Sequence, residues 1–254
     1  ISWFENNGSE SFTERVIDGS LDGAWDVHPV DMDGDGDLDI AAAGINAAGI
    51  VWYNNNGSES FTKQTIQSSF NGSSVYPVDL DGDGDMDVVG SAWNESEDND
   101  DIFWFANDGS ESFTKYSIEK EFAKSRGHVK TVDMDRDGDL DIIGSAEVSS
   151  QVAWFENNGS QSFTKHTISE GFFGAWDVQV TDMDGDGDVD VIGTAFYGND
   201  IAWFEFADVT APTMTITAHN GSSAIVDGSS TNDGTLAITF TSSEITNNFV
   251  AGDI

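Results

Sequence analysis

The sequence contains no cysteine, and this absence excludes disulfide bonds, thiolate metal sites and cysteine nucleophiles together. Basic residues are also scarce, because 9 Lys and Arg stand against 47 Asp and Glu, for a formal net charge of −38. Nine basic side chains could not neutralise many phosphates, which excludes a nucleic-acid partner. There is no apolar run of the roughly 18 residues that a membrane span needs, and no signal-peptide pattern.

Other features of the composition predict a folded chain. Proline is rare, with 3 residues, but 27 Gly and 11% aromatic residues are not typical of a disordered acidic tail. The chain starts at Ile1 rather than Met, which predicts a processed or truncated parent protein and a larger modular chain.

The acidic residues are concentrated in four copies of one loop. The first copy, Asp31-Met-Asp-Gly-Asp-Gly-Asp-Leu-Asp39, returns three times with five Asp at alternate positions. Carboxylates a few Å apart repel one another, and a bound cation is the simplest remedy. The candidate metal ligands are Asp31, Asp33, Asp35, Asp37, Asp39, Asp79, Asp81, Asp83, Asp85, Asp87, Asp133, Asp135, Asp137, Asp139, Asp141, Asp182, Asp184, Asp186, Asp188 and Asp190.

The spacing within the loop indicates calcium. Positions 1, 3, 5 and 9 offer carboxylates, Gly36 permits a sharp turn, and the backbone carbonyl of Asp37 can face inward. Hard oxygen ligands on a short loop suit Ca²⁺, so we expect about four ions, one per loop. An EF-hand would need Glu at position 12 and helical flanks. That position instead holds Ala42, Gly90, Gly144 and Gly193, and the flanks read as strands.

The loops belong to a longer repeat. Their starts are 48, 54 and 49 residues apart, and a Trp-aromatic pair keeps step with them, as in Trp52-Tyr53. The first full copy predicts four strands at 24–30, 38–44, 49–54 and 60–66, with the acidic loop between the first two. Four-stranded antiparallel units of this length are the blades of an all-β propeller.

The strand count predicts three full blades and two partial ones. The chain opens on a hairpin at about 1–17 and ends the propeller with three strands of a fourth blade near Phe206. Both ends supply the third strand of a blade, so they do not complement each other. We therefore expect an arc of a larger ring, with an irregular closure of four or five blades as the alternative.

These residues resemble the FG-GAP/VCBS-type repeats of integrin-α-like propellers. The resemblance rests on the acidic loops and on the segment that follows them, as in Val89-Gly-Ser-Ala92. It implies a propeller segment over 1–207 and calcium in the loops. The literal Phe-Gly and Gly-Ala-Pro elements are absent, which favours the VCBS-type branch. Arg136 replaces the loop Gly in the third copy, and its charge is expected to weaken that site.

The C-terminal part has a different composition. Residues 208–212 read as a linker, and 213–254 shift to Thr, Ser and Ile with alternating strands such as 213–217 and 235–240. This segment resembles the start of a bacterial Ig-like domain. It has too few residues for a complete sandwich of ~100, so we expect an incomplete β-sandwich.

The predicted function is binding rather than catalysis. The blade face opposite the acidic loops varies between copies, as a recognition face does, although drift in unconstrained loops would look the same. The candidate ligand-binding residues are Trp25, Trp93, Arg126, Trp176 and Tyr197. The predicted partner is a cell-surface glycan or protein. The alternatives are a polysaccharide lyase, with Arg126 against a sugar carboxylate, and a passive spacer.

The charge also predicts a location. Four bound Ca²⁺ would leave the net charge of −38 at about −30, so calcium explains where the charge is concentrated but not its total. A salty medium screens such self-repulsion. We therefore expect an extracellular, secreted or cell-surface protein of a marine or halophilic bacterium.

Overall fold

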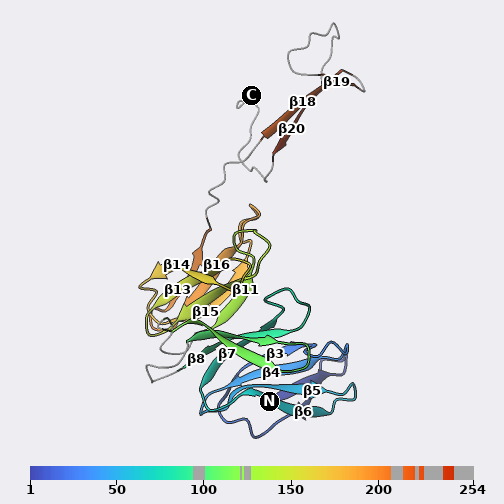
Figure 1. The fold of residues 1–254 in the computed structure, drawn as a ribbon, viewed down its shortest axis with the longest axis vertical. Helices are drawn as coiled ribbons and strands as arrows, with labels where there is room; N and C mark the ends of the chain where they lie inside the picture. The colour runs from blue at the N-terminus through green and yellow to red at the C-terminus, as the bar shows by residue number, and fades with distance from the viewer. Residues whose placement is uncertain are drawn as a thin grey trace. The chain divides into compact units, whose positions relative to one another are not determined.

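The chain folds into β-strands joined by turns. A computed structural model describes residues 1–93, 101–120, 122, 127–206, 214–220, 223–225 and 237–242, and this part of the chain contains no helix (Figure 1). Accordingly, nothing in these residues forms a helix that could cross a membrane. The chain divides into two compact units, residues 1–180 with 191–204, and residues 181–190 with 205–254.

Three four-stranded antiparallel sheets follow one another along the chain as successive blades. Their strands are β3 (Ala24–Val30), β4 (Asp39–Gly44), β5 (Gly49–Asn55) and β6 (Phe61–Gln67); β7 (Gly72–Val78), β8 (Asp87–Ala92), β9 (Ile102–Asn107) and β10 (Phe113–Glu119); and β11 (Val129–Val132), β12 (Asp141–Ala146), β13 (Gln151–Asn157) and β14 (Phe163–Glu170). In the first blade each boundary lies within one residue of the prediction.

Two partial blades flank these sheets. A hairpin of β1 (Ser2–Asn6) and β2 (Phe12–Val16) comes first, and a three-stranded sheet of β15 (Ala175–Thr181), β16 (Asp190–Ala195) and β17 (Asp200–Phe204) comes last. The structure therefore confirms the all-β propeller of three full and two partial blades. The extent of the ring in a parent protein stays a prediction.

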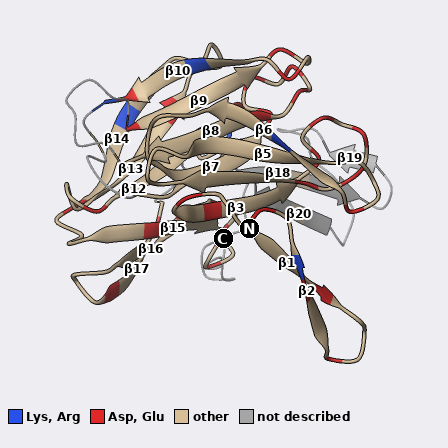
Figure 2. Ribbon diagram, turned by 90° about the horizontal axis from the view of Figure 1, so that it is seen from below, with Lys and Arg blue, Asp and Glu red and all other residues tan. Residues whose placement is uncertain are grey.

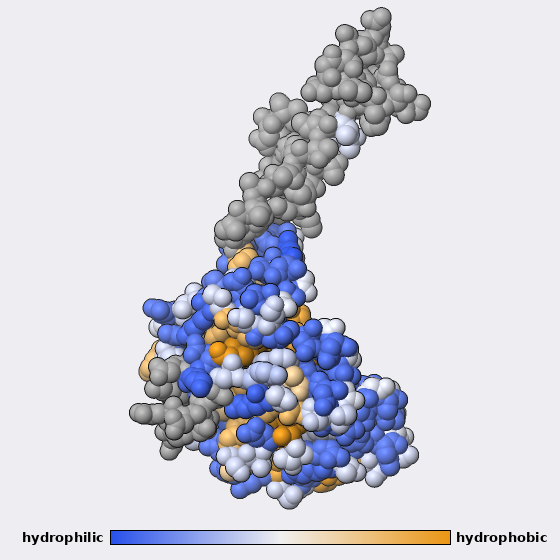
Figure 3. Space-filling model, in the orientation of Figure 1, coloured by the Kyte–Doolittle hydropathy of each residue, from blue (hydrophilic) through white to orange (hydrophobic). Residues whose placement is uncertain are grey.

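The hydrophobic core lies between neighbouring blades. Ala41, Ile50 and Trp52 of the first blade pack with Val75, Phe103 and Phe105 of the second. Trp104 of the second blade packs in the same way with Val129 and Phe155 of the third. Neither face of a single blade is covered within that blade, so each sheet depends on its neighbour. The surface seen in Figure 3 is mostly hydrophilic, with small apolar patches.

Side-chain hydroxyls link neighbouring blades close to their first strands, which we call the inner strands. Ser91 Oγ donates to the Gly127 carbonyl at 2.5 Å, and Ser145 Oγ donates to the Trp176 carbonyl at 2.8 Å. The first blade has Ala43 at this position, and its tie is instead the Asp26 carboxylate, which accepts from Ser74 Oγ at 3.1 Å. The Gly-Ser-Ala segment thus has a physical role at the blade interface.

The second unit contains a three-stranded antiparallel sheet in the order β19-β18-β20. Its strands are β18 (Met214–Asn220), β19 (Ser223–Ile225) and β20 (Ala237–Ser242). The Ig-like assignment stays a prediction, and so do the domain boundaries. The predicted linker at 208–212 lies outside the described residues.

Candidate metal and ligand sites

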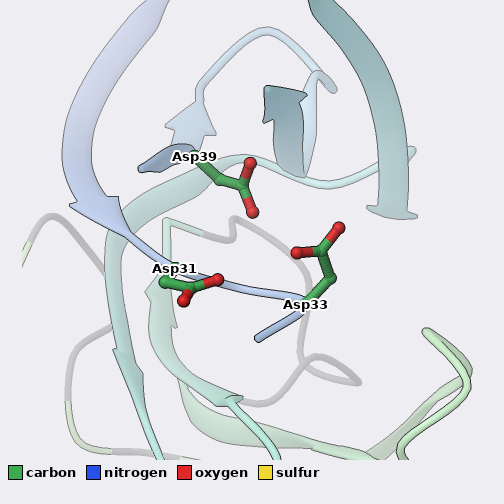
Figure 4. A group of neighbouring side chains, drawn as sticks. All are labelled: Asp31, Asp33 and Asp39. Carbon is green, nitrogen blue, oxygen red and sulfur yellow. The ribbon is translucent and has the colours of Figure 1, made fainter. Parts of the chain in front are cut away.

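Three aspartates converge in each acidic loop. One carboxylate oxygen from each of Asp31, Asp33 and Asp39 lies within 4.8 Å of the others (Figure 4). The same three loop positions converge in the other copies, at Asp79, Asp81 and Asp87, at Asp133, Asp135 and Asp141, and at Asp182, Asp184 and Asp190. The acidic residues are gathered in connecting loops more than along strands (Figure 2). Each loop therefore presents a cluster of hard oxygen donors.

The ninth loop position fixes the carboxylate at the base of the cluster. Asp39 is fully buried, and it accepts backbone N–H groups from Met32 at 3.0 Å and from Asn55 at 2.7 Å. Asp87, Asp141 and Asp190 accept the equivalent pair in their own loops, from Leu80 and Asn107, Met134 and Asn157, and Met183 and Phe206. This aspartate thus joins the loop to the third strand of the blade, or to its extension.

Burial of these carboxylates opposes their ionisation. Loss of solvent raises the pKa of Asp87 to about 7 and that of Asp141 to about 6, against the accepted N–H bonds, which lower it. Burial also raises the pKa of Asp39. A cation in the cluster would reverse this effect, because an opposite charge within a few Å favours the ionised form.

An orphaned oxygen supports the fit to a cation. Asp31 Oδ2 accepts the Gly36 N–H at 3.0 Å, whereas Asp31 Oδ1 is buried and has no hydrogen-bond partner among the described residues. Asp133 Oδ1 in the third loop is in the same state. A buried carboxylate oxygen without a donor is unfavourable unless a cation contacts it. The donor set, all oxygen and largely anionic, suits Ca²⁺.

The other two loop aspartates lie outside the cluster. Asp35 Oδ1 accepts the Asp37 N–H at 2.9 Å, and the Asp37 carboxylate lies against Gly57 in the turn between β5 and β6. The same pairs are Asp83 and Asp85, and Asp137 and Asp139. In the fourth loop Asp186 Oδ1 accepts the Asp188 N–H. The structure thus groups three of the five predicted ligands per loop. In the three full blades it also places each acidic loop against the turn between the third and fourth strands.

The turn glycines of the loops adopt the geometry expected for them. Gly36 has φ of 96°, in the left-handed region where a side chain is unfavourable. Arg136, which replaces the fourth-position Gly in the third loop, also has positive φ, at 64°. That loop therefore carries backbone strain as well as the extra positive charge.

Aromatic side chains gather at the other end of the inner strands. Trp25 of β3 and Trp176 of β15 have ring centroids 6.0 Å apart. Phe196 lies 5.7 Å from Trp176, and Tyr197 lies 5.2 Å from Phe196. Phe196 is 65% exposed and Tyr197 52% exposed. We call Trp25, Trp176, Phe196 and Tyr197 the aromatic patch.

The aromatic patch departs from the repeat. Six residues before each loop the chain has Trp25, Ser73, Gly127 and Trp176 in turn. Ser73 is fully buried against Ser91, and a Cβ at Gly127 would overlap the Ser145 carbonyl. The two middle blades therefore have no room for Trp at this position, whereas the first and last blades carry it.

Polar residues lie beside the aromatic patch. His128 Nδ1 is 3.5 Å from Asp177 Oδ1, and the His128 ring centroid is 6.5 Å from that of Trp176. Farther along the inner strands, His28 contacts the edge of the Tyr76 ring, and Lys130 Nζ lies 4.9 Å above that ring. The inner strands thus bring together residues separated by up to three blades.

The structure unites three of the five predicted ligand residues. Trp25, Trp176 and Tyr197 meet in the patch. Trp93 is partly buried and lies in the second blade, where its backbone N–H donates to the Asn71 carbonyl at 2.8 Å. Arg126 lies outside the described residues. Phe196 was not among the predicted ligand residues. The connection after β16 differs in sequence from those of the other blades, and this difference could have indicated it.

Comparisons with known proteins agree with this architecture. The model of the FG-GAP-like repeat matches residues 1–42, 31–90 and 133–193, which is more than half of the chain. No curated protein matches the chain.

A solved structure also resembles it. This is a lectin of Agrocybe aegerita, described as recognising non-reducing terminal N-acetylglucosamine, with 20% identity and a TM-score of 0.52 over 76% of this chain. The match covers 54% of the lectin, so the chain spans about half its length. At this identity the likeness concerns the fold.

Proposed function

Since the chain belongs to the FG-GAP-like repeat family, we propose that it is a calcium-stabilised, extracellular β-propeller module that binds glycans at the aromatic patch. The single observation that carries the binding proposal is the patch itself. Four aromatic residues from β3, β15 and the connection after β16 converge there, and the two Trp stand where the middle blades have Ser73 and Gly127. Exposed aromatic rings offer a sugar ring a flat apolar surface. The lectin described above shows that a propeller of this fold can serve glycan recognition.

Calcium has a structural role in this proposal. The first, third and ninth aspartates of each loop would hold the ion, which supplies positive charge to a cluster of buried and repelling carboxylates. The protein residues fix the geometry, because the ninth aspartate joins the loop to the rest of the blade. Extracellular calcium modules bind in the ~10⁻⁴–10⁻³ M range, and such calcium concentrations favour a location outside the cell.

We propose a binding module rather than an enzyme. A lyase needs a general base, and His28 and Lys130, two side chains of the first strands that could serve, both lie against the Tyr76 ring. The partner that the aromatic patch favours is a cell-surface glycan, and the proposed role is adhesion.

The proposal is tested by glycan binding to the whole chain in excess calcium. Wild-type protein on a glycan array should give reproducible hits. Trp176→Ala and Tyr197→Ala should each weaken binding by about tenfold or more, as for central contact residues. Trp203→Ala removes another exposed Trp, outside the patch, and should leave binding unchanged. A wild-type array without hits, or equal losses in all three variants, would contradict the proposal.

A further inference from the structure

We infer that His128 and Asp177 form the polar half of the ligand site and select sugars through uncharged hydroxyl groups, against sugars that carry a carboxylate. This inference rests on the proposed function, because it takes the aromatic patch as the place where the sugar ring stacks. It adds the ligand class and the residues that determine it.

The backbone of both residues is fixed beside Trp176. The backbone N–H of His128 donates to Ser145 Oγ at 3.0 Å, and the same hydroxyl donates to the Trp176 backbone carbonyl at 2.8 Å. The Asp177 N–H donates to Thr194 Oγ1 at 3.2 Å, and Asp177 Oδ1 accepts the Val178 N–H at 2.9 Å. Ser145 thus links the histidine directly to the tryptophan. A site held in this way loses little entropy when a ligand binds.

Asp26 provides an internal comparison. It occupies the equivalent position of β3 and makes the equivalent bond, from Val27 N–H to Asp26 Oδ1 at 2.9 Å. Its second oxygen accepts from Ser74 Oγ and from the Val75 N–H at 3.0 Å, so Asp26 serves the blade interface. Asp177 Oδ2 accepts no hydrogen bond within the described part of the chain. The Asp177 side chain is partly exposed, and the residue follows Trp176 directly in the sequence.

The chemistry of this pair defines the ligand. A carboxylate oxygen accepts hydroxyl protons, and hydrogen bonds to a charged acceptor are stronger than neutral ones. The partly exposed imidazole beside it adds a second hydrogen-bonding group, a donor or acceptor according to its tautomer. A sugar carboxylate at the same place would meet Asp177 at close range and be repelled. The site therefore fits a neutral pyranoside with hydroxyls at its edge.

Matched probes test the inference. Oligosaccharides ending in galactose or glucose are compared with the same chains ending in galacturonate or glucuronate, by calorimetry on the full chain in excess calcium. The neutral member of each pair should bind about tenfold or more tightly. Asp177→Asn should remove most of this preference and weaken neutral binding by about tenfold, with the melting temperature almost unchanged. Asp26→Asn should lower the melting temperature and keep the preference.

The outcomes separate this inference from the proposed function. If Tyr197→Ala abolishes binding while Asp177→Asn binds like wild type, only this inference is overturned. Tighter binding of the uronates would also overturn it, and would instead indicate a cation such as Arg126 in the site. Failure of the wild-type chain to bind any of the four probes, with no hit on the glycan array, would overturn both.

Discussion

The dependence of calcium stabilisation on pH follows from the buried loop carboxylates. Asp87 and Asp141 are completely buried, and burial raises their pKa to about 7 and about 6 from the ordinary 3.8. An acid whose pKa is raised in the folded state stabilises the fold fully only below its unfolded pKa. Without calcium this stability is lost as the pH rises from about 4 through 6 and 7.

The magnitude follows from the size of the shifts. At about 1.4 kcal/mol per pH unit, ionising Asp87 costs the calcium-free fold about 4 kcal/mol, and ionising Asp141 costs about 3 kcal/mol. For a chain of this size 1 kcal/mol corresponds to about 2–4 °C, so Asp87 alone is worth roughly 10 °C. A bound Ca²⁺ removes the penalty by stabilising the ionised form. The gain in melting temperature from calcium should therefore be larger at pH 8 than at pH 5.

The assay is thermal unfolding followed by circular dichroism at pH 5 and pH 8, in excess EDTA and in excess calcium. In EDTA the melting temperature should be lower at pH 8 than at pH 5. In calcium it should not decrease in this way. Asp87→Asn should reduce the pH dependence in EDTA, whereas Asp108→Asn, in an exposed turn, should not. A calcium effect of equal size at both pH values, or melting curves that EDTA does not change, would refute the reasoning.

Two further predictions concern the geometry of the loops. Asp81→Ala, at a clustered position, should remove about one of four calcium ions in a calorimetric titration, whereas Asp85→Ala, whose carboxylate lies against Gly109, should keep all four; equal losses would show that both are ligands. Gly109→Ala should destabilise the chain by about 1–3 kcal/mol in urea unfolding, because the residue has φ of 74° and its Cβ would meet Asp85. Gly8→Ala has φ of 75° in open space, so it should cost less, and equal effects would exclude a role for the contact.

The sequence predicted the parts of this fold that repeat. Strand boundaries in the first blade agree within one residue, because each strand is bounded by an Asp-rich loop or an Asn-Gly turn of fixed geometry. The sequence predicted only part of the convergence among the aspartates. It distinguished Asp37 from the positions that offer carboxylates, and in the structure Asp39 begins β4 and is buried, whereas the Asp37 carboxylate faces the turn at Gly57. It also expected a carboxylate from Asp35, which instead accepts the Asp37 N–H, and this difference depends on the folded shape of the loop.

The aromatic patch could be predicted only in part, for a related reason. Trp25 and Trp176 are separated by three blades in sequence, and their contact depends on how β3 and β15 converge. The variation between copies indicated Trp25, Trp176 and Tyr197 as candidates but not that they lie together. His128 and Asp177 are 49 residues apart in the sequence, and only the structure places them together at 3.5 Å.

The difference between repeated and unrepeated features also determines how many ligands the module can hold. The carboxylate cluster recurs in four loops because every blade can build it from its own residues. The aromatic patch needs bulky residues at a position where the second blade buries Ser73 and the third has Gly127 against a carbonyl. Such residues fit only in the first and last blades, and there they contact each other. The chain should therefore bind about four calcium ions but a single sugar, and a sugar stoichiometry above one per chain would place recognition outside the patch.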